Sequence, residues 1–262
     1  MQRHHLALLA LLLSAFAVFA VVSALEPPVI AGHQLKSSGI YETLTAVREL
    51  PVTPVDTVEA DTVVPAVQFP AKTDTASQTI LFIGDSMLEG LGPRLAAYAE
   101  KNGHTLYNVI WYSSTSLQWG TSDRLRHYIS TIHPTYIFVC LGANELFVKD
   151  IITKRRDYVR HMVADIDTIP YVWIGPPNWK PDTGINTLVA EETAPGTFFL
   201  SDGMEFERSR DGAHPTRSSA ALWMDSVARW MPLHCAHPIR MDKPDKASGR
   251  PARVFVHQPD ER

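Results

Sequence analysis

Three residues from two distant parts of the chain have the chemistry of a nucleophilic relay. Ser86 stands in the run IGDSMLEG, while Asp211 and His214 stand in DGAHPT. A histidine can take the proton of a serine hydroxyl near neutral pH, and a neighbouring aspartate can orient and support the imidazole. These residue types predict acyl transfer, with Ser86 as nucleophile, His214 as general base and Asp211 as the group that orients it.

Each of these residues also has a purely structural interpretation. Ser86 and Glu89 have the spacing of a helix capping box. Asp211 can cap a turn at Gly212, which would leave His214 simply exposed. We favour the nucleophile because the motifs occur together, and a serine at the start of a helix gains from nearby N–H groups in either case.

Apolar strands that alternate with amphipathic helices predict the frame that would hold these residues. Strand-like runs are expected at Thr79–Ile83, Leu106–Trp111, Thr135–Leu141, Tyr171–Ile174 and Thr197–Leu200. Helical periods are expected over Leu88–Asn102, Ser122–Ile132, Thr153–Thr168 and after Thr216. This alternation predicts a three-layer α/β domain, in which a parallel sheet of about five strands is covered by helices on both faces. Ligands bind at the carboxyl edge of such a sheet, where Ser86 would lie.

Three short motifs in this order resemble the SGNH (GDSL-type) hydrolase superfamily. They are GDS at Gly84–Ser86, GAN at Gly142–Asn144 and DxxH at Asp211–His214. The resemblance covers residues 79–231, and the runs IGDSMLEGLG and VWIGPPNW are most similar to a secreted bacterial branch. It implies an SGNH or flavodoxin-like fold that needs no cofactor and no metal. It also implies that Asp85 supports the turn beside Ser86 without reacting.

The resemblance also implies an oxyanion hole. Its donors would be the backbone N–H of Ser86, the side-chain amide of Asn144 and the N–H of a residue after the second strand. That last residue is usually glycine, whereas here Ser116 stands at the expected place and Gly120 is the alternative. A second departure is Glu145, because an aspartate commonly follows the asparagine in this superfamily.

Large aromatic side chains follow the predicted strands and suggest a weaker set of substrate contacts. Trp111, Tyr112, Trp119 and Trp179 lie in these positions, the last beside Pro176-Pro177. They would line a sugar-binding cleft, or they would only pack the rim of the sheet.

The N-terminus predicts export. Leu6–Leu25 is apolar except for two serines and follows Arg3 and two histidines, which is long enough for a membrane-spanning signal-anchor. A signal peptide cleaved near Ala24 is the alternative. Residues 26–77, rich in Pro, Val, Thr and acidic side chains, then predict an extended spacer.

The remaining chain divides into the hydrolase domain at 78–232 and a polar, proline-rich tail at 233–262, which we expect to be mobile. A net charge of −4 and a pI near 6.2 exclude a basic surface for nucleic acid. Cys140 lies in an apolar run and is expected in the core. Cys235, with His234 and His237, is not expected to hold a metal.

The sequence therefore predicts an exported, membrane-anchored serine esterase in the periplasm or extracellular space. Its substrate would be an ester-linked acyl group on a small molecule or a glycan, with an O-acetyl group of the cell envelope among the candidates. Two alternatives remain open: an O-acyltransferase with the same relay, and a non-catalytic protein that uses the fold to bind polysaccharide.

Overall fold

The computed structural model describes residues 29–30, 33–34 and 71–259. The chain divides into two units, residues 1–64 and 65–262. In the first unit, β1 (Val29–Ile30) pairs with β2 (His33–Gln34) in antiparallel orientation.

Two predictions for the N-terminal part fall on residues that are not described. They are the hydrophobic segment at Leu6–Leu25 and most of the spacer at 26–77. Within the described part of the chain, no helix has the length and hydropathy needed to span a membrane.

A parallel sheet forms the centre of the larger unit. Among residues 71–259 it has six strands, in the order β7-β6-β5-β3-β4-β8. Their bounds are β3 (Thr79–Gly84), β4 (Thr105–Trp111), β5 (Tyr136–Cys140), β6 (Tyr171–Ile174), β7 (Phe198–Phe199) and β8 (Arg253–His257). Because β4 and β5 flank β3 on opposite sides, the strand order reverses beside the carboxyl end of β3, which is where ligands bind in such sheets.

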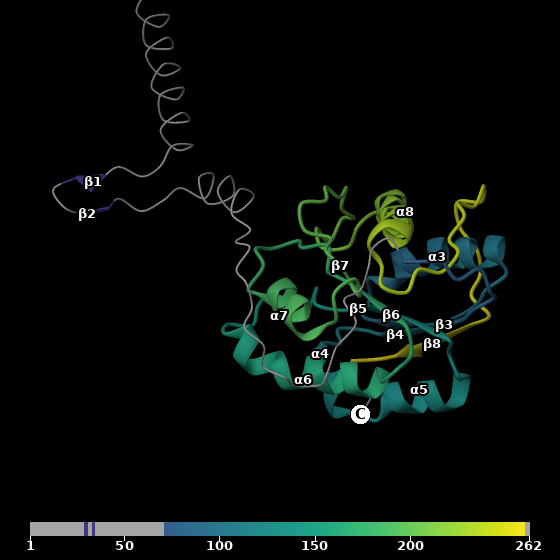
Figure 1. Cartoon of the computed structure of the whole chain (residues 1–262), viewed down its shortest axis with the longest axis horizontal. Helices are drawn as coiled ribbons and strands as arrows, with labels where there is room; N and C mark the ends of the chain where they lie inside the picture. The colour runs from purple at the N-terminus through teal and green to yellow at the C-terminus, as the bar shows by residue number, and fades with distance from the viewer. Residues whose placement is uncertain (1–28, 31–32, 35–70, 260–262) are drawn as a thin grey trace, which may run out of the picture. The chain divides into compact units, whose positions relative to one another are not determined.

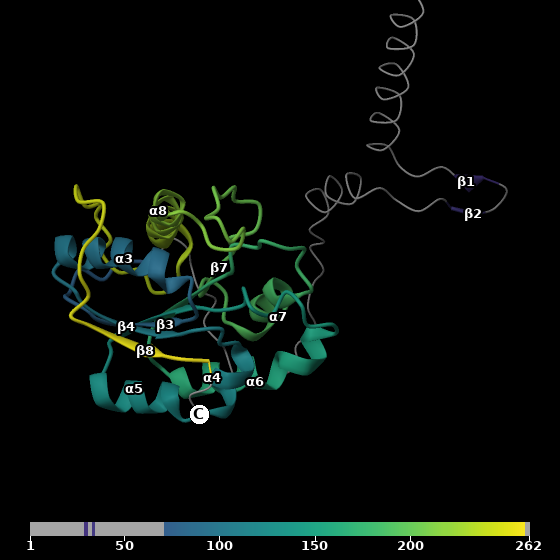
Figure 2. The ribbon, with the colours of Figure 1, turned by 180° about the vertical axis from the view of Figure 1, so that it is seen from behind.

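Helices cover both faces of this sheet, as predicted. Figures 1 and 2 show α3 (Leu88–Asn102) and α8 (Arg217–His234) on one face. The other face carries α4 (Ser116–Thr121), α5 (Arg124–Ile132), α6 (Ile151–Ile166) and α7 (Ile185–Glu192).

The central strand β3 shows why the core has two halves. Ile80 and Phe82 pack into the cluster beneath α3 and α8, whereas Leu81 and Ile83 pack into the cluster on the other face, and all are 0% exposed. Successive side chains on a strand point to opposite faces, so a strand that is buried on both faces must be continuously apolar.

Local sequence signals mark the end of α3 and the start of α8, as expected. Gly103 follows α3 with a φ of 74°, a left-handed conformation that suits glycine. At the start of α8, the side chain of Thr216 accepts a hydrogen bond from the N–H of Ser219.

The prediction of a mobile polar tail at 233–262 is wrong where β8 forms. Strand β8 pairs with β4 in parallel, so the sheet has six strands rather than about five. Two backbone bonds lead into it, from Gly249 N–H to Pro93 O (2.8 Å) and from Ala252 N–H to Leu106 O (2.7 Å). As an edge strand, β8 stays partly exposed, and its five residues lie among prolines and charges that mask the strand pattern.

The last residues of the predicted spacer pack onto the domain. Asp74 forms an isolated parallel bridge with Ile239, through bonds from Asp74 N–H to Pro238 O (2.7 Å) and from Arg240 N–H to Asp74 O (2.9 Å). The domain therefore begins a few residues before its first predicted strand.

Candidate active site

A sharp turn at the end of β3 carries Ser86. Gly84 is required there, because a Cβ on it would lie 2.2 Å from the carbonyl oxygen of Cys140 on the neighbouring strand. The carboxylate of Asp85 then accepts the N–H of Met87 at 2.9 Å, which turns the chain into α3. Asp85 thus supports the turn, as expected.

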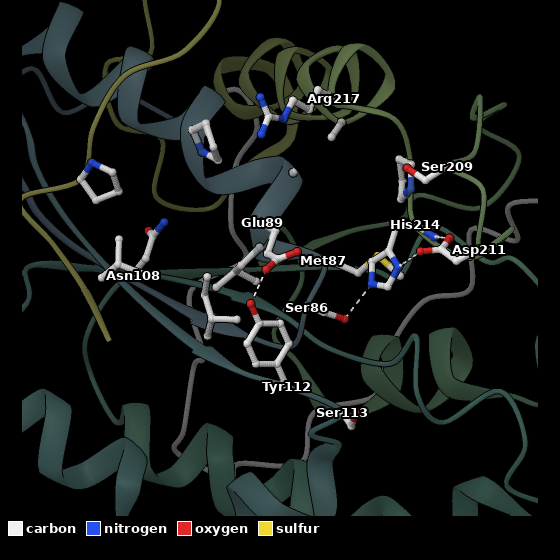
Figure 3. A pocket seen from close by; sticks show the side chains of 18 residues that line it. Ser86, Met87, Glu89, Asn108, Tyr112, Ser113, Ser209, Asp211, His214 and Arg217 are labelled. Atoms are coloured by element: carbon white, nitrogen blue, oxygen red, sulfur yellow. Dashed lines mark hydrogen bonds and ion pairs between the residues drawn. The ribbon is translucent and has the colours of Figure 1, made fainter. Parts of the chain in front are cut away.

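The predicted relay forms. His214 Nε2 lies 2.8 Å from Ser86 Oγ, and His214 Nδ1 lies 2.8 Å from Asp211 Oδ2 (Figure 3). The ionised carboxylate accepts the Nδ1 proton, which leaves Nε2 free to accept the hydroxyl proton of Ser86. The geometry thus suits proton transfer from serine to imidazole.

The environment of Asp211 keeps its carboxylate charged. Backbone N–H groups of His214 and Ala213 donate to Oδ1, and with the His214 ring they lower the pKa of Asp211 to about 2. A carboxylate that is ionised at neutral pH can stabilise an imidazolium in this position.

The capping alternative for Ser86 is not the arrangement seen. The N-cap of α3 is Met87, and Ser86 bonds to His214 instead. Glu89, the expected partner in a capping box, accepts a hydrogen bond from the hydroxyl of Tyr112.

Asp85 is fully buried behind the nucleophile. Burial raises the pKa of Asp85 to about 7 against the lowering effect of the Met87 N–H. Its second oxygen accepts the side-chain amide of Asn144 at 3.2 Å. A carboxyl so close to the relay therefore changes charge near neutral pH.

The loop that carries Asp211 and His214 is fastened by Arg208. Its guanidinium donates to the carbonyl oxygens of Ala213 (2.6 Å), Pro177 (2.8 Å) and Asn178 (3.0 Å). The first lies in the histidine loop, and the other two follow β6. Arg208 was not singled out from the sequence, because nothing in its neighbourhood distinguishes it from a surface arginine.

The assignment of Ser116 to the oxyanion hole is wrong. Its N–H donates to Glu145 Oε2 at 3.2 Å and its hydroxyl donates to Glu145 Oε1 at 2.5 Å. Ser116 is the first residue of α4 and is fully buried, so its N–H is not presented to a substrate. Gly120, the alternative, lies in α4, and a Cβ on it would lie 2.6 Å from Tyr158 O, so it serves close helix packing.

Glu145 has a structural environment. It is 0% exposed, and Arg155 forms an ion pair with it at 3.2 Å. Burial raises the pKa of Glu145, while Ser116 and Arg155 act in the opposite direction. The glutamate after Asn144 therefore fastens α4 and α6 to the end of β5 and takes no visible part in the relay.

Asn144 follows β5 and contacts Asp85, the residue that precedes Ser86. Its amide nitrogen donates to Asp85 Oδ2 (3.2 Å) and to the carbonyl oxygen of Ser114 (3.1 Å). Both amide protons are thus engaged within the protein, and the role of Asn144 as an oxyanion donor stays a prediction.

Ser113 is the residue that the sequence analysis missed. It follows β4, has a φ of 57° and lines the pocket that contains Ser86. A non-glycine residue with positive φ is uncommon, and such strain concentrates at functional sites. A left-handed backbone is one that glycine adopts without strain, and Ser113 stands three residues before Ser116.

Two of the three tryptophans proposed as substrate contacts are buried instead. Trp119 is 0% exposed and Trp111 is 3% exposed, and their rings pack edge to face at 5.5 Å. Trp179 is partly buried against Phe147, and its N–H donates to Ala143 O at 3.1 Å. None of the three lines the pocket around Ser86; Tyr112 does.

The relay opens into a pocket of about 730 Å³. Figure 3 shows Ser86 and His214 at one end, Glu89 and Tyr112 next, and Asn108 at the other end. A volume of this size is typical of a site for a drug-sized ligand.

Comparison with solved structures finds similar chains. They include the psychrotrophic esterase EstA from a Pseudoalteromonas species (20% identity, 58% of this chain and 97% of that one, TM-score 0.42). TesA shares 20% identity over 57% of this chain and 96% of its own, with a TM-score of 0.46. A protein from Desulfitobacterium hafniense DCB-2, described as lipolytic and of the G-D-S-L family, shares 13% identity over 58% and 98%, with a TM-score of 0.40. No family model and no curated protein matches the chain.

Proposed function

We propose that this chain is a serine hydrolase of carboxylic esters, of the SGNH kind that its motifs resemble. The observation that carries the proposal is the continuous relay Asp211–His214–Ser86, with both of its hydrogen bonds at 2.8 Å. A buried or capping serine would not need an imidazole at this distance, nor an aspartate behind it.

The reaction follows from the geometry. Ser86 Oγ attacks the ester carbonyl carbon while its proton passes to His214 Nε2. The C–O bond to the alcohol breaks, and His214 returns the proton to the leaving oxygen. Water then attacks the acyl-enzyme with His214 again as base, which releases the acid and restores Ser86.

The negative oxygen of each tetrahedral intermediate needs preorganised donors. We assign this role to the backbone N–H groups of Ser86 and Ser113 and to the amide of Asn144, which would exchange one of its present acceptors for the oxyanion. Ser113 replaces Ser116 because it lines the pocket and Ser116 does not. Removing one donor typically lowers turnover by about 10²–10³, so Asn144→Ala should lower kcat by this factor.

Covalent labelling tests the proposal directly. A fluorophosphonate should modify Ser86, as read by mass spectrometry, and Ser86→Ala should abolish both labelling and hydrolysis of p-nitrophenyl acetate. Ser226→Ala is the matched control, because Ser226 lies on α8 outside the pocket and, within the described part of the chain, bonds only to residues of its own helix. Hydrolysis that survives intact in Ser86→Ala would overturn the assignment.

The proposal extends to the cell envelope as the place of action and to acylated glycans or small molecules as substrates. Its support is the apolar run Leu6–Leu25 and the spacer that follows. Fractionation of cells, with N-terminal sequencing of the mature protein, tests export and distinguishes an anchor from cleavage near Ala24. Comparison of free acetate with acetylated acceptor distinguishes hydrolysis from O-acyl transfer.

A further inference from the structure

One row of β4 side chains forms the floor of the pocket. Asn108 and Ile110 are alternate residues of β4, Tyr112 follows directly after the strand, and all three line the pocket. The register pairs Phe82 of β3 with Asn108 and Gly84 with Ile110, and beyond the ends of these strands Ser86 and Tyr112 both line the pocket. From Tyr112 to Asn108 the floor covers four residues, which is roughly 13 Å at the rise of a strand.

The walls of this part are apolar. They comprise Pro93 of α3 and Pro251 and Val254 of the C-terminal segment. Val254 pairs with Asn108 across the sheet and is 46% exposed. We call the part bounded by Asn108, Ile110, Pro93, Pro251 and Val254 the recess.

The far end of the recess is polar. Asn108 is 2% exposed, and among the described residues its Oδ1 has no hydrogen-bond partner. Its amide also packs against Gly92 of α3, where a Cβ would lie 2.3 Å from Nδ2. The apolar section is therefore closed by α3 and by one amide, which sets a limit to its length.

The position of His214 determines which part of an ester can enter the recess. His214 must protonate the leaving oxygen, so the alcohol has to lie beside Nε2. Figure 3 shows Asn108 on the side of Ser86 away from His214, with Glu89 and Tyr112 between. The acyl group, which points away from the leaving oxygen, is thus the part directed toward the recess.

We propose that the recess binds an aliphatic acyl chain of medium length, so that the enzyme prefers octanoyl to acetyl esters. This inference rests on the proposed function. Each methylene that moves from water to the apolar walls makes the free energy of binding more favourable. An acetyl group would leave most of the pocket unfilled. The segment of Pro251 and Val254 therefore determines acyl specificity.

Two valines on β8 provide a matched experiment. Val254 and Val256 are 46% and 47% exposed and share one face of the same edge strand, but only Val254 lines the pocket. Val254→Phe should lower kcat/KM for p-nitrophenyl octanoate by at least about tenfold, as expected when methylenes lose an apolar site. The ratio of kcat/KM for p-nitrophenyl octanoate to kcat/KM for p-nitrophenyl acetate should fall by the same factor, whereas Val256→Phe should leave this ratio at the wild-type value.

A second readout does not depend on turnover. Titration calorimetry with sodium octanoate should show binding to the wild type and to Val256→Phe, and at least about tenfold weaker binding to Val254→Phe. The inference would be overturned if Val254→Phe changed kcat/KM equally for both esters, or for neither, and the two variants bound octanoate equally well. Ester hydrolysis as the proposed function would still stand in that case. A wild type that binds octanoate but hydrolyses no ester and resists fluorophosphonate would instead refute the proposed function and support the recess.

Discussion

The carboxylate of Asp211 is hydrogen-bonded to both the backbone N–H and the imidazole ring of His214. Oδ1 accepts the backbone N–H of His214 at 3.0 Å, while Oδ2 faces Nδ1 at 2.8 Å. One carboxylate therefore fixes both the position of the residue and the tautomer of its imidazole, although Asp211 is itself exposed.

Asp211→Asn should separate these two roles. The amide oxygen can still accept the backbone N–H, but the amide nitrogen would donate toward Nδ1 and favour the tautomer that cannot accept the serine proton. We expect kcat to fall by about 10⁴, as for the same change in other relays. Steady-state kinetics measure it, with thermal unfolding as control; a fall below tenfold would contradict the role.

Ser116→Ala should affect stability rather than catalysis. Its hydroxyl and N–H bond to the buried Glu145, so the loss of the hydroxyl leaves a buried carboxylate oxygen with one partner fewer. The free energy of unfolding should fall by about 1–3 kcal/mol. Urea unfolding checks this, and turnover per fluorophosphonate-labelled site should be unchanged. A drop of 10² in turnover at full stability would show that the hydroxyl of Ser116 has a role beyond holding Glu145.

Arg208→Met should slow the reaction without touching the reacting atoms. It removes the donors that join the histidine loop to the residues after β6, and a displacement of the relay by about 1 Å can cost 10² in rate. Fluorophosphonate labelling should slow in parallel with kcat. The control is Arg210→Met, an exposed neighbour for which no slowing is expected. Equal rates in the two variants would exclude a positioning role.

Asp85 should make stability depend on pH. Burial raises its pKa from 3.8 to about 7, so between these values the folded protein retains a proton that the unfolded chain releases. Its contribution to stability is full below pH 3.8 and is lost as pH rises toward 7. Asp85→Asn should flatten this fall, as measured by urea unfolding from pH 4 to 8. Parallel curves for the two proteins would contradict the shift.

The sheet and the relay could be predicted because their signals are local and independent. The strands β3 to β6 are buried on both faces, so their apolar runs are easily recognised in the sequence. Gly103 marks the end of α3, and Thr216 marks the start of α8. The motifs around Ser86 and His214 lie next to these element ends, which fixes their place at one edge of the sheet.

The features that could not be predicted from the sequence depend on contacts between residues that are far apart in the chain. Strand β8 is recognisable only from its partner β4, because three of its five residues are exposed and its flanks are polar. Ser113 and Ser116 differ in φ and in burial, neither of which can be read from the run YSSTS. Trp119 belongs to α4, which has only six residues. A helix this short shows no periodic pattern from which the burial of Trp119 could be predicted.

The pairing of β8 with β4 also has a consequence for biosynthesis. A ribosome makes β8 long after β4, so while the intervening residues are synthesised the hydrogen-bonding groups along one side of β4 have no strand to satisfy them. Unsatisfied edges of this kind attract other nascent chains. Premature termination before Arg253 would therefore yield a polypeptide that retains the nucleophile, the imidazole and the carboxylate yet is prone to aggregate.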